Sequence, residues 1–356
     1  MQFQNGLNGS PEQYGKGVKF ISVGDILNNI YITYDNIKGL IDIDEKTLNN
    51  YSVTYGDILF QRSSEIKNDI GRTNVYLDKN NIATFGGFVI RGKKIGQYDP
   101  VFFNYLLKAP SSRKSIIRLG AGAQHYNIGQ ENIKTLNFYF PNEKEQAKIA
   151  YLFSKIDERI QTQIKIIDSI SSQKKQIRNI LFNDIHQTPN CCVQDYVIYE
   201  QPQKYIVHDS DYLPYSKSLI PVLTANQSFV LGYTSENDGI YKKGDCIIFD
   251  DFTNESKYVN FPFKIKSSAL KILQTKEGLL LKFFYEYLQF LNFAAINHKR
   301  HYLSEVAITE INVPDLKKQS YVCKVLSSVD IKLKNEEIIL KNYKLQKHFL
   351  LANLFV

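Results

Sequence analysis

The stretch FYFPNEKEQAKIAYLFSKIDERI (Phe138–Ile160) occurs a second time, 173 residues further along the chain, as INVPDLKKQSYVCKVLSSVDIKL (Ile311–Leu333). The same offset also matches single residues within and beyond this stretch: Pro141 with Pro314, Gln146 with Gln319, Asp157 with Asp330, Lys174 with Lys347, Leu181 with Leu354 and Phe182 with Phe355. Self-similarity at a fixed spacing indicates an internal duplication, so we expect two copies of one structural unit.

Upstream of each copy the similarity continues with gaps. The matched pairs are Gly56–Phe60 with Gly244–Phe249, and His125-Tyr126 with His301-Tyr302. Each half is therefore expected to contain a Gly-Asp strand, an apolar helix, a basic polar loop, a strand that ends at proline, and a long helix. The two apolar helices are expected at Pro100–Lys108 and Gly278–Phe293.

Both long helices carry a heptad pattern, with seam residues spaced alternately three and four apart. The apolar seam positions are Phe153, Ile156, Ile160, Ile167, Ile170, Ile177 and Leu181 in the first helix, and Leu326, Val329, Leu333, Leu340, Tyr343, Leu350 and Leu354 in the second. Polar residues interrupt the two seams at matching places, which are Gln163 with Glu336 and Lys174 with Lys347. Matching interruptions favour pairing between the two helices, since a polar seam residue tends to fix register.

We therefore predict an α+β fold with a pseudo-twofold internal repeat, in which two similar mixed domains are separated by two long helices that form an antiparallel coiled coil. The expected boundaries are 1–141 and 188–314 for the domains, and 142–187 and 315–356 for the helices. A helix of roughly 40 residues is about 60 Å long, so antiparallel pairing would hold the domains at opposite ends of a rod. The alternative is that each helix packs on its own domain.

Composition agrees with a folded, multi-domain protein. The chain has 356 residues, of which 43% are hydrophobic and 13% aromatic, and this length exceeds one ordinary hydrophobic core. The sequence shows no apolar run long enough for a signal peptide or a membrane span, so a cytoplasmic location is expected. The four cysteines form no CxxC pair, and six sparse histidines give no metal-ligand spacing.

The net charge of +8 permits a polyanionic partner without identifying one. By segment, the charge is +4 over residues 1–141 and −2 over residues 188–314, so bulk charge does not argue for nucleic acid in the second domain. Catalytic motifs are weak: Gly9–Lys16 lacks the spacing and hydroxyl of a phosphate-binding loop. Asp251, Glu255 and Lys257 crowd together as in a solvated turn, so we expect no enzyme.

The long-helix segments resemble the conserved helical region of the specificity subunit of type I restriction-modification systems. The residues that carry the resemblance are Pro141, Glu143, Glu145-Gln146, Lys148-Ile149, Leu152, Asp157, Ile160, Lys174-Lys175 and Leu181-Phe182. The second domain resembles a target recognition domain of that family through Pro221–Asn226, Asp250–Thr253 and Phe261–Ser268. The second helix copy departs from the pattern at Lys318 and Val322, where the first has Glu145 and Ile149.

This resemblance implies a non-catalytic, sequence-specific DNA-binding subunit. Its two domains would each read half of a split, asymmetric site in double-stranded DNA, with the helix pair setting the distance between the halves. The implied partners are methyltransferase subunits, expected as two copies docked on the helices, with restriction subunits as further candidates. No cofactor would bind to this chain, and S-adenosylmethionine would bind to the methyltransferase.

The first domain departs from the family at its start. Family members have a longer lead-in, like Val193–Val207 ahead of the second domain, whereas here Gly17–Val23 follows almost at once. Either the first domain is trimmed, or its missing strand is supplied elsewhere.

Base reading requires Arg, Lys, Asn or Gln at the groove edges, with basic and hydroxyl groups on the phosphates. The candidates in the first domain are Arg62, Ser63, Arg72, Arg113, Lys114, Arg118, Gln124, His125, Tyr126 and Asn127. Those in the second are Asn254, Lys257, Lys299, Arg300, His301 and Tyr302. The competing hypothesis is a coiled-coil scaffold whose end domains bind protein, which the slightly acidic second domain supports.

Overall fold

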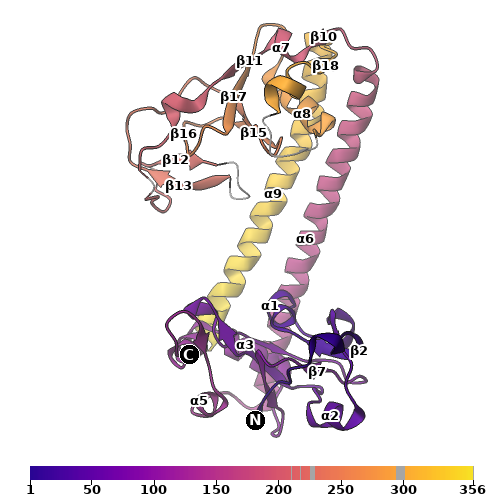
Figure 1. Cartoon of the computed structure of the whole chain (residues 1–356), viewed down its shortest axis with the longest axis vertical. Helices are drawn as coiled ribbons and strands as arrows, with labels where there is room; N and C mark the ends of the chain where they lie inside the picture. Colours follow the sequence, from indigo (N-terminus) through magenta and orange to yellow (C-terminus); the bar gives the residue numbers. More distant parts are fainter. Residues whose placement is uncertain (210, 217, 225–228, 294–300, 356) are drawn as a thin grey trace. The chain divides into compact units, whose positions relative to one another are not determined.

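The computed structural model describes residues 1–209, 211–216, 218–224, 229–293 and 301–355. It divides into two compact units. The first unit comprises Met1–Lys165 with Ile338–Val356, and the second comprises Ile166–Glu337. Each unit therefore holds one globular segment, the beginning of the helix that leaves it, and the end of the other long helix. Both chain termini belong to the first unit (Figure 1).

The first unit begins with a strand and ends its globular part at the first long helix. Its strands are β1 (Gln2–Asn5), β2 (Tyr14–Ile21), β3 (Gly39–Ile41), β4 (Ile58–Gln61), β5 (Ser63–Ser64), β6 (Thr73–Val75), β7 (Thr84–Phe85), β8 (Val89–Lys93) and β9 (Tyr126–Asn127). Its helices are α1 (Val23–Asn28), α2 (Glu45–Asn50), α3 (Pro100–Lys108), α4 (Pro110–Arg118), α5 (Gln130–Lys134) and the start of α6 (Glu143–His186), with 3-10 turns at Pro11–Gln13, Tyr34–Asn36 and Lys67–Asp69.

The second unit repeats much of this order. Its strands are β10 (Cys191–Cys192), β11 (Val197–Glu200), β12 (Ile220–Leu223), β13 (Val230–Thr234), β14 (Cys246–Asp250), β15 (Ser256–Val259), β16 (Lys264–Ile265), β17 (Leu270–Thr275) and β18 (Glu310–Ile311). Its helices are α7 (Val193–Tyr196), α8 (Leu281–Leu291) and the start of α9 (Leu316–Leu354), with a 3-10 turn at Pro202–Tyr205 and a π-helical turn at Tyr302–Val306.

The sheets show the duplication directly. The larger sheet has the order β1-β8-β4-β6 in the first unit and β11-β17-β14-β15 in the second, antiparallel throughout. The smaller sheet has the order β3-β2-β7 and then β13-β12-β16, each with one parallel pair. The predicted α+β repeat is confirmed at the level of strand order.

Successive side chains of the central strands point to opposite faces of the larger sheet, and this explains why both faces are covered. In β4, Ile58 and Phe60 pack with α3, whereas Leu59 points into a second cluster with residues of the smaller sheet. In β14, Ile247 and Phe249 pack with α8, and Ile248 points the other way. Side chains of a strand point alternately to opposite faces, so near-continuous apolar strands of this kind need a layer on each side.

A buried glutamine in the first turn of each long helix ties the helix to its own domain. The Gln146 amide donates to the Pro141 carbonyl (2.7 Å), and its side-chain oxygen accepts from the backbone N–H of Asp99 (3.0 Å). Gln319 makes the equivalent bonds to Pro314 (2.7 Å) and Leu280 (2.8 Å). The glutamines matched by the repeat thus connect the start of α3 or α8 to the following long helix.

The two long helices pair antiparallel within each unit, as predicted. In the first unit Lys347 Nζ lies 2.5 Å from Asp157 Oδ1, and Phe355 stacks on Phe153 with ring centroids 5.6 Å apart. In the second unit Lys174 Nζ lies 2.6 Å from Asp330 Oδ1. The alternative in which each helix packs only on its own domain is therefore wrong.

Most predicted seam residues are buried or half-buried, and the last one is not. Phe153, Ile156, Ile160, Ile170 and Leu326 are buried. Leu354, however, is 42% exposed, and its neighbour Phe355 is buried against α3. The heptad pattern of buried seam residues therefore stops one turn before Leu354. Phe355 enters the core of the first unit instead, and its carbonyl accepts a hydrogen bond from the Ser111 hydroxyl.

Two expectations about the first domain need correction. The strand expected before Pro141 does not form in the described chain, whereas its counterpart in the second unit is the short strand β18, which pairs with β10. The supposedly missing lead-in strand is β1, which comes before Gly17–Val23 and pairs with β8 as β11 pairs with β17. The short lead-in therefore still supplies the edge strand of the larger sheet.

Replacing Glu286 by glutamine should destabilise the second unit by about 3 kcal/mol, because removing one partner of a buried ion pair leaves its counter-charges uncompensated. The fully buried Glu286 carboxylate lies 3.0 Å from Lys174 Nζ and 2.9 Å from the Arg178 guanidinium. Urea unfolding measures the effect, with the exposed Glu337→Gln as the matched control. A loss of stability below about 1 kcal/mol would contradict this assignment.

Candidate nucleic-acid interface

Two predicted stretches that are distant in sequence meet in the first unit. Strand β5 pairs antiparallel with β9, which places Ser63 opposite Asn127 and Ser64 opposite Tyr126. The Ser63 hydroxyl donates to the side-chain oxygen of Asn127. Polar side chains from both stretches therefore form one surface.

The β5–β9 pair supports an exposed loop. Ala121 and Asn127 exchange backbone hydrogen bonds of 3.0 and 2.8 Å, which closes the loop between them. Gly122 has a φ of +136°, and a Cβ there would lie 2.0 Å from the His125 carbonyl oxygen, so the turn requires glycine. The loop consequently presents Gln124 and His125 to solvent.

Helix α4 ends beside this loop with a basic face. Lys114 and Arg118 are exposed and four residues apart, so they lie on the same side of the helix. Arg118 occupies the last turn, where a cation is favoured by the helix dipole. The Leu119 carbonyl that follows accepts a hydrogen bond from the Asn132 amide (3.4 Å). Lys114 and Arg118 form no intramolecular ion pair among the described residues.

The other candidate arginines of the first unit, which are Arg62, Arg72 and Arg113, have intramolecular partners. Arg113 donates to the carbonyls of Asn68, Ile70 and Gly71 at 2.7–3.0 Å, and burial followed by the charge of Arg72 lowers the pKa of Arg113 to about 10. Carbonyl oxygens thus hold the guanidinium of Arg113 within the protein, and its contact with DNA stays a prediction. Arg72 pairs with Asp69 (2.5 Å) but stays exposed, and half-buried Arg62 donates to the Gly87 carbonyl (3.1 Å).

A hollow of about 330 Å³ adjoins this surface, lined by Lys108, Arg72 and Arg113 together with Ile26, Leu27, Asn29, Asn68 and Thr73. Burial, followed by the charge of Lys347, lowers the pKa of Lys108 to about 7 against the opposing effect of Asp157. Lys108 is thus held close to the point of losing its proton at neutral pH.

In the second unit the candidate residues lie in two different environments, an exposed turn and the core. Lys257 is exposed on β15, and Asn254 adopts the left-handed conformation (φ 59°) in the turn that precedes it. The Asp250 carboxylate accepts the backbone N–H groups of Phe252 (2.7 Å) and Thr253 (3.1 Å) and so fixes that turn. Asp250 therefore orders the turn that carries Asn254 and Lys257.

The His301-Tyr302 pair is part of the core. The Tyr302 ring is 1% exposed and packs on Phe249 and Tyr199, and buried Asp251 accepts its backbone N–H (2.8 Å). His301 is also buried and bonds to Glu305 (2.9 Å). The expectation that these two side chains contact DNA is wrong. Lys299 and Arg300, and Ala225 with Asn226 of the resemblance, lie outside the described residues.

The match between His125-Tyr126 and His301-Tyr302 is likewise wrong. Sheet pairing makes Arg62 equivalent to Asp251. The Arg62 carbonyl accepts from Ile128 N (3.0 Å), whereas the Asp251 carbonyl accepts from His301 N (3.0 Å). Ile128 and not His125 therefore corresponds to His301, as the 173-residue offset requires, and the exposed loop of the first unit precedes this position.

Two further features were not predicted from the sequence, which are a cluster of one histidine and two carboxylates and an exposed turn that carries a lysine. His208, Glu236 and Asp238 come together in the second unit, but Glu236 is occupied by Lys264 (2.5 Å) and by two backbone N–H groups. In the first unit Lys67 and Asn68 are exposed between Arg62 and Arg72. Their position between two predicted stretches was the available signal for including them.

Comparison with known proteins relates part of the chain to a described protein family. Residues 7–171 match the type I restriction modification DNA specificity domain. The match covers the first globular segment and the beginning of α6, which is less than half of the chain. Among the helices of the described residues, none is long and apolar enough to span a membrane.

Three known proteins illustrate the likeness. The chain is 46% identical to the EcoR124I/EcoR124II specificity subunit of Escherichia coli over 122 residues, covering 33% of this chain and 30% of that protein. It is 25% identical to the putative MjaX specificity subunit of Methanocaldococcus jannaschii over 230 residues, covering 63% of this chain and 52% of that one. The aligned part thus spans about a third to a half of these two relatives.

The third relative, a solved structure, extends the likeness to the whole fold. The S subunit of a type I restriction-modification system from M. genitalium has a TM-score of 0.56 and 17% identity, covering 100% of this chain and 93% of that one. At this identity the likeness concerns the fold alone. It supports the predicted arrangement of two mixed domains with long helices.

Replacing Lys108 by methionine should remove one pH-dependent contribution to stability. The lysine pKa falls from its ordinary 10.5 to about 7 on folding, so between these values the unfolded chain binds more protons and stability rises with pH. Calorimetry from about pH 7 to pH 9.5 should show a rise in Tm for the wild type that Lys108→Met lacks, with the variant more stable at neutral pH. Exposed Lys114→Met should keep the wild-type slope; a Lys108→Met chain that also keeps it would contradict the role of Lys108.

Proposed function

We propose that this chain is the DNA-recognition subunit of a type I restriction-modification complex and has no catalytic activity of its own. The observation that carries the proposal is the family match over residues 7–171 on a chain whose two units repeat one strand order. The curated relatives are both named as specificity subunits. DNA is then the chemical partner to which the exposed polar loop and basic helix face of the first unit should bind.

The first unit offers the better-defined reading surface. Lys114 and Arg118 are exposed without intramolecular ion pairs among the described residues, and the neighbouring loop adds Gln124, His125 and Asn127. Long cationic side chains bind phosphates well, whereas side-chain amides can hydrogen-bond to base edges in the major groove. In the second unit, exposed Lys257 with Asn254 is the corresponding candidate among the described residues.

We further propose that the two units read two separate half-sites. Similar sheets with different loops can carry different base preferences, which would make the whole site asymmetric. Two small readers on one chain gain affinity and discrimination through effective concentration. The paired helices α6 and α9, which both contribute to each unit, would keep the spacing of the half-sites constant.

Methyltransferase subunits are the proposed protein partners, and they would bind S-adenosylmethionine. Their docking on the long helices is supported by large apolar side chains that these helices expose. On α6 these are Tyr151, Leu152, Ile166 and Ile180, and on α9 they are Leu316, Tyr321, Ile331, Ile338, Ile339, Leu345, Phe349 and Leu354. Exposed apolar side chains on otherwise polar helices are typical of interaction surfaces. Restriction subunits would join where the system also cleaves DNA.

Replacing Lys114 and Arg118 together by alanine should weaken DNA binding about equally for all sequences. It should also lower the slope of log affinity against log salt by about 1 for each phosphate that the variant no longer binds. Fluorescence anisotropy with duplex DNA at several salt concentrations measures both quantities. The double variant Lys144→Ala, Lys148→Ala has the same spacing and charge change on α6, and it should bind like the wild type. Binding that is indifferent to salt would favour the scaffold hypothesis instead.

Methylation of host DNA should depend on this chain at a site of two short halves with a constant spacer. Methylome sequencing with and without the gene tests this, because only a complex that contains both the reader and a methyltransferase leaves such a mark. Asn254→Gly, which tolerates the left-handed conformation of this turn, should relax preference in one half and leave the other unchanged. A single contiguous site, or methylation that persists without the gene, would contradict the bipartite reading.

A further inference from the structure

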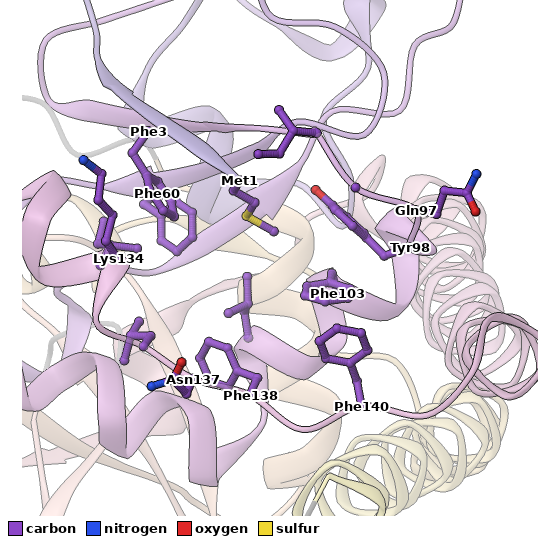
Figure 2. Close-up of a pocket in the computed structure, with 15 residues that line it drawn as sticks. Met1, Phe3, Phe60, Gln97, Tyr98, Phe103, Lys134, Asn137, Phe138 and Phe140 are labelled. Atoms are coloured by element: carbon purple, nitrogen blue, oxygen red, sulfur yellow. The ribbon is translucent and has the colours of Figure 1, made fainter.

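Two hollows of the first unit differ in chemistry. The larger, of about 470 Å³, is bordered mainly by apolar side chains, among them Met1 and Phe103 (Figure 2). The smaller, of about 330 Å³, is lined by the cations Arg72, Lys108 and Arg113, and none of its described lining residues is acidic. Positive charge that is concentrated in a concave surface attracts anions, so the smaller hollow is a candidate anion site.

The carboxylates whose charges reach these cations already have partners. Asp69 pairs with Arg72 (2.5 Å). Asp157, the carboxylate that acts on Lys108, pairs with Lys347 (2.5 Å). Lys108 is half-buried and makes no hydrogen bond or ion pair with another described residue. Its ammonium group therefore lacks an adjacent counter-charge, which an external anion would supply.

The second unit has a direct hydrogen bond at the equivalent place. Thr73 and Ser256 are equivalent, because each pairs with the matching phenylalanine of the central strand, β4 or β14. Lys108 and Gln289 are equivalent when both are counted from the residue whose N–H binds the helix-start glutamine. The Gln289 amide donates to the Ser256 hydroxyl (2.7 Å). In the second unit these two side chains therefore satisfy each other.

In the first unit the corresponding two residues do not form this bond. Thr73 is 3% exposed, and its hydroxyl has no hydrogen-bond partner among the described residues. Thr73 and Lys108 both line the hollow. A buried hydroxyl without a partner destabilises a fold, so a ligand that accepts hydrogen bonds from both residues would stabilise this place.

A phosphate group fits the donors that surround the hollow. The Lys108 ammonium offers three N–H groups, and Arg72 uses only its Nε and one terminal nitrogen for Asp69. Asn68 adds an exposed side-chain amide. Arg113 is fixed by three backbone carbonyls, which do not cancel its charge. Several cations around one hollow suit a doubly charged tetrahedral oxyanion better than a singly charged, planar carboxylate.

We propose that this hollow binds a phosphate group, which accepts hydrogen bonds from Lys108, Thr73 and Arg72. Arg113 holds the turn 68–71 in place and adds positive charge. The group is either a phosphate of the DNA backbone or that of a small phosphorylated compound, since both present the same oxygens. The proposal does not rest on the proposed function, because inorganic phosphate alone is its first probe.

Isothermal titration calorimetry of the full chain with inorganic phosphate, at low chloride concentration, tests the site. We expect saturable one-to-one binding that Lys108→Met weakens at least tenfold. Lys46→Met, at an exposed position of α2 with the same change in charge, should leave the binding unchanged. The double variant Lys108→Gln, Thr73→Ser copies the pair of the second unit and should also bind at least tenfold more weakly. Heat of dilution alone, or wild-type affinity in both Lys108 variants, would overturn the proposal.

Sulfate, whose charge is constant between about pH 6 and pH 9, separates direct binding by Lys108 from a structural role. The charged groups around Lys108 are Lys347 of α9, Asp157 of α6, and Arg72 and Arg113 of the hollow. The pKa of Lys108 is about 7, so the affinity of the wild type for sulfate should fall at least tenfold as the pH rises through this range. Lys108→Met should bind weakly throughout. A flat profile in the wild type would contradict direct binding by Lys108.

Duplex DNA distinguishes the two sources of the phosphate group. If the hollow takes a backbone phosphate, DNA should displace inorganic phosphate, and Lys108→Met should lower the slope of log affinity against log salt by about 1. If the hollow takes a small phosphorylated compound, the chain should bind DNA and inorganic phosphate together, with the salt slope unchanged. Should DNA fail to bind at all, the proposed function would be contradicted, whereas saturable phosphate binding would still support this site.

Discussion

An ion pair between the two long helices, present once in each unit, is the constraint on which the pairing depends. Lys347 of α9 contacts Asp157 of α6 in the first unit, and Lys174 of α6 contacts Asp330 of α9 in the second. These are the same two positions of the repeat with the helices exchanged. A lysine in an apolar seam is costly unless a carboxylate faces it, and the observed antiparallel register supplies a carboxylate to both lysines. The pairs therefore define register more than they add stability.

Around these equivalent pairs the two units have diverged. In the first, the Tyr105 hydroxyl donates to Asp157 (2.7 Å), and burial together with the charge of Asp157 raises the pKa of Tyr105. In the second, the position equivalent to Tyr105, counted from the residue that binds the helix-start glutamine, is Glu286, which faces Lys174 and Arg178. One cluster is completed by a neutral hydroxyl and the other by a second carboxylate. The charges of each helix segment are thus complemented by side chains of the unit in which that segment lies.

The sequence was sufficient for the repeat, the apolar helices and the pairing of the long helices, because periodicity and matched interruptions are properties of local sequence. It did not reveal that Asp157 and Asp330 would face the seam lysines, since both lie outside the heptad positions. For the candidate site, local composition correctly gave an exposed loop at Gln124 and His125. It did not reveal the intramolecular partners of Arg113 and Tyr302, because carbonyl groups from Asn68–Gly71 and the buried Asp251 are brought to them only by tertiary folding.

The two copies differ in some places and agree in others, and this pattern suggests how one fold could read two different half-sites. Strand order and the glutamine bonds at the helix starts are retained, because altering them would expose core or leave buried polar groups unpaired. The segments between these elements carry no such restriction. At equivalent backbone positions, the first unit places Arg62 beside an open polar loop, whereas the second places Asp251 beneath a buried histidine and tyrosine. Under the proposed function, surfaces of such different chemistry on equivalent sheets are expected to prefer different bases, and the asymmetry of the DNA site would then follow from loop divergence on a retained core.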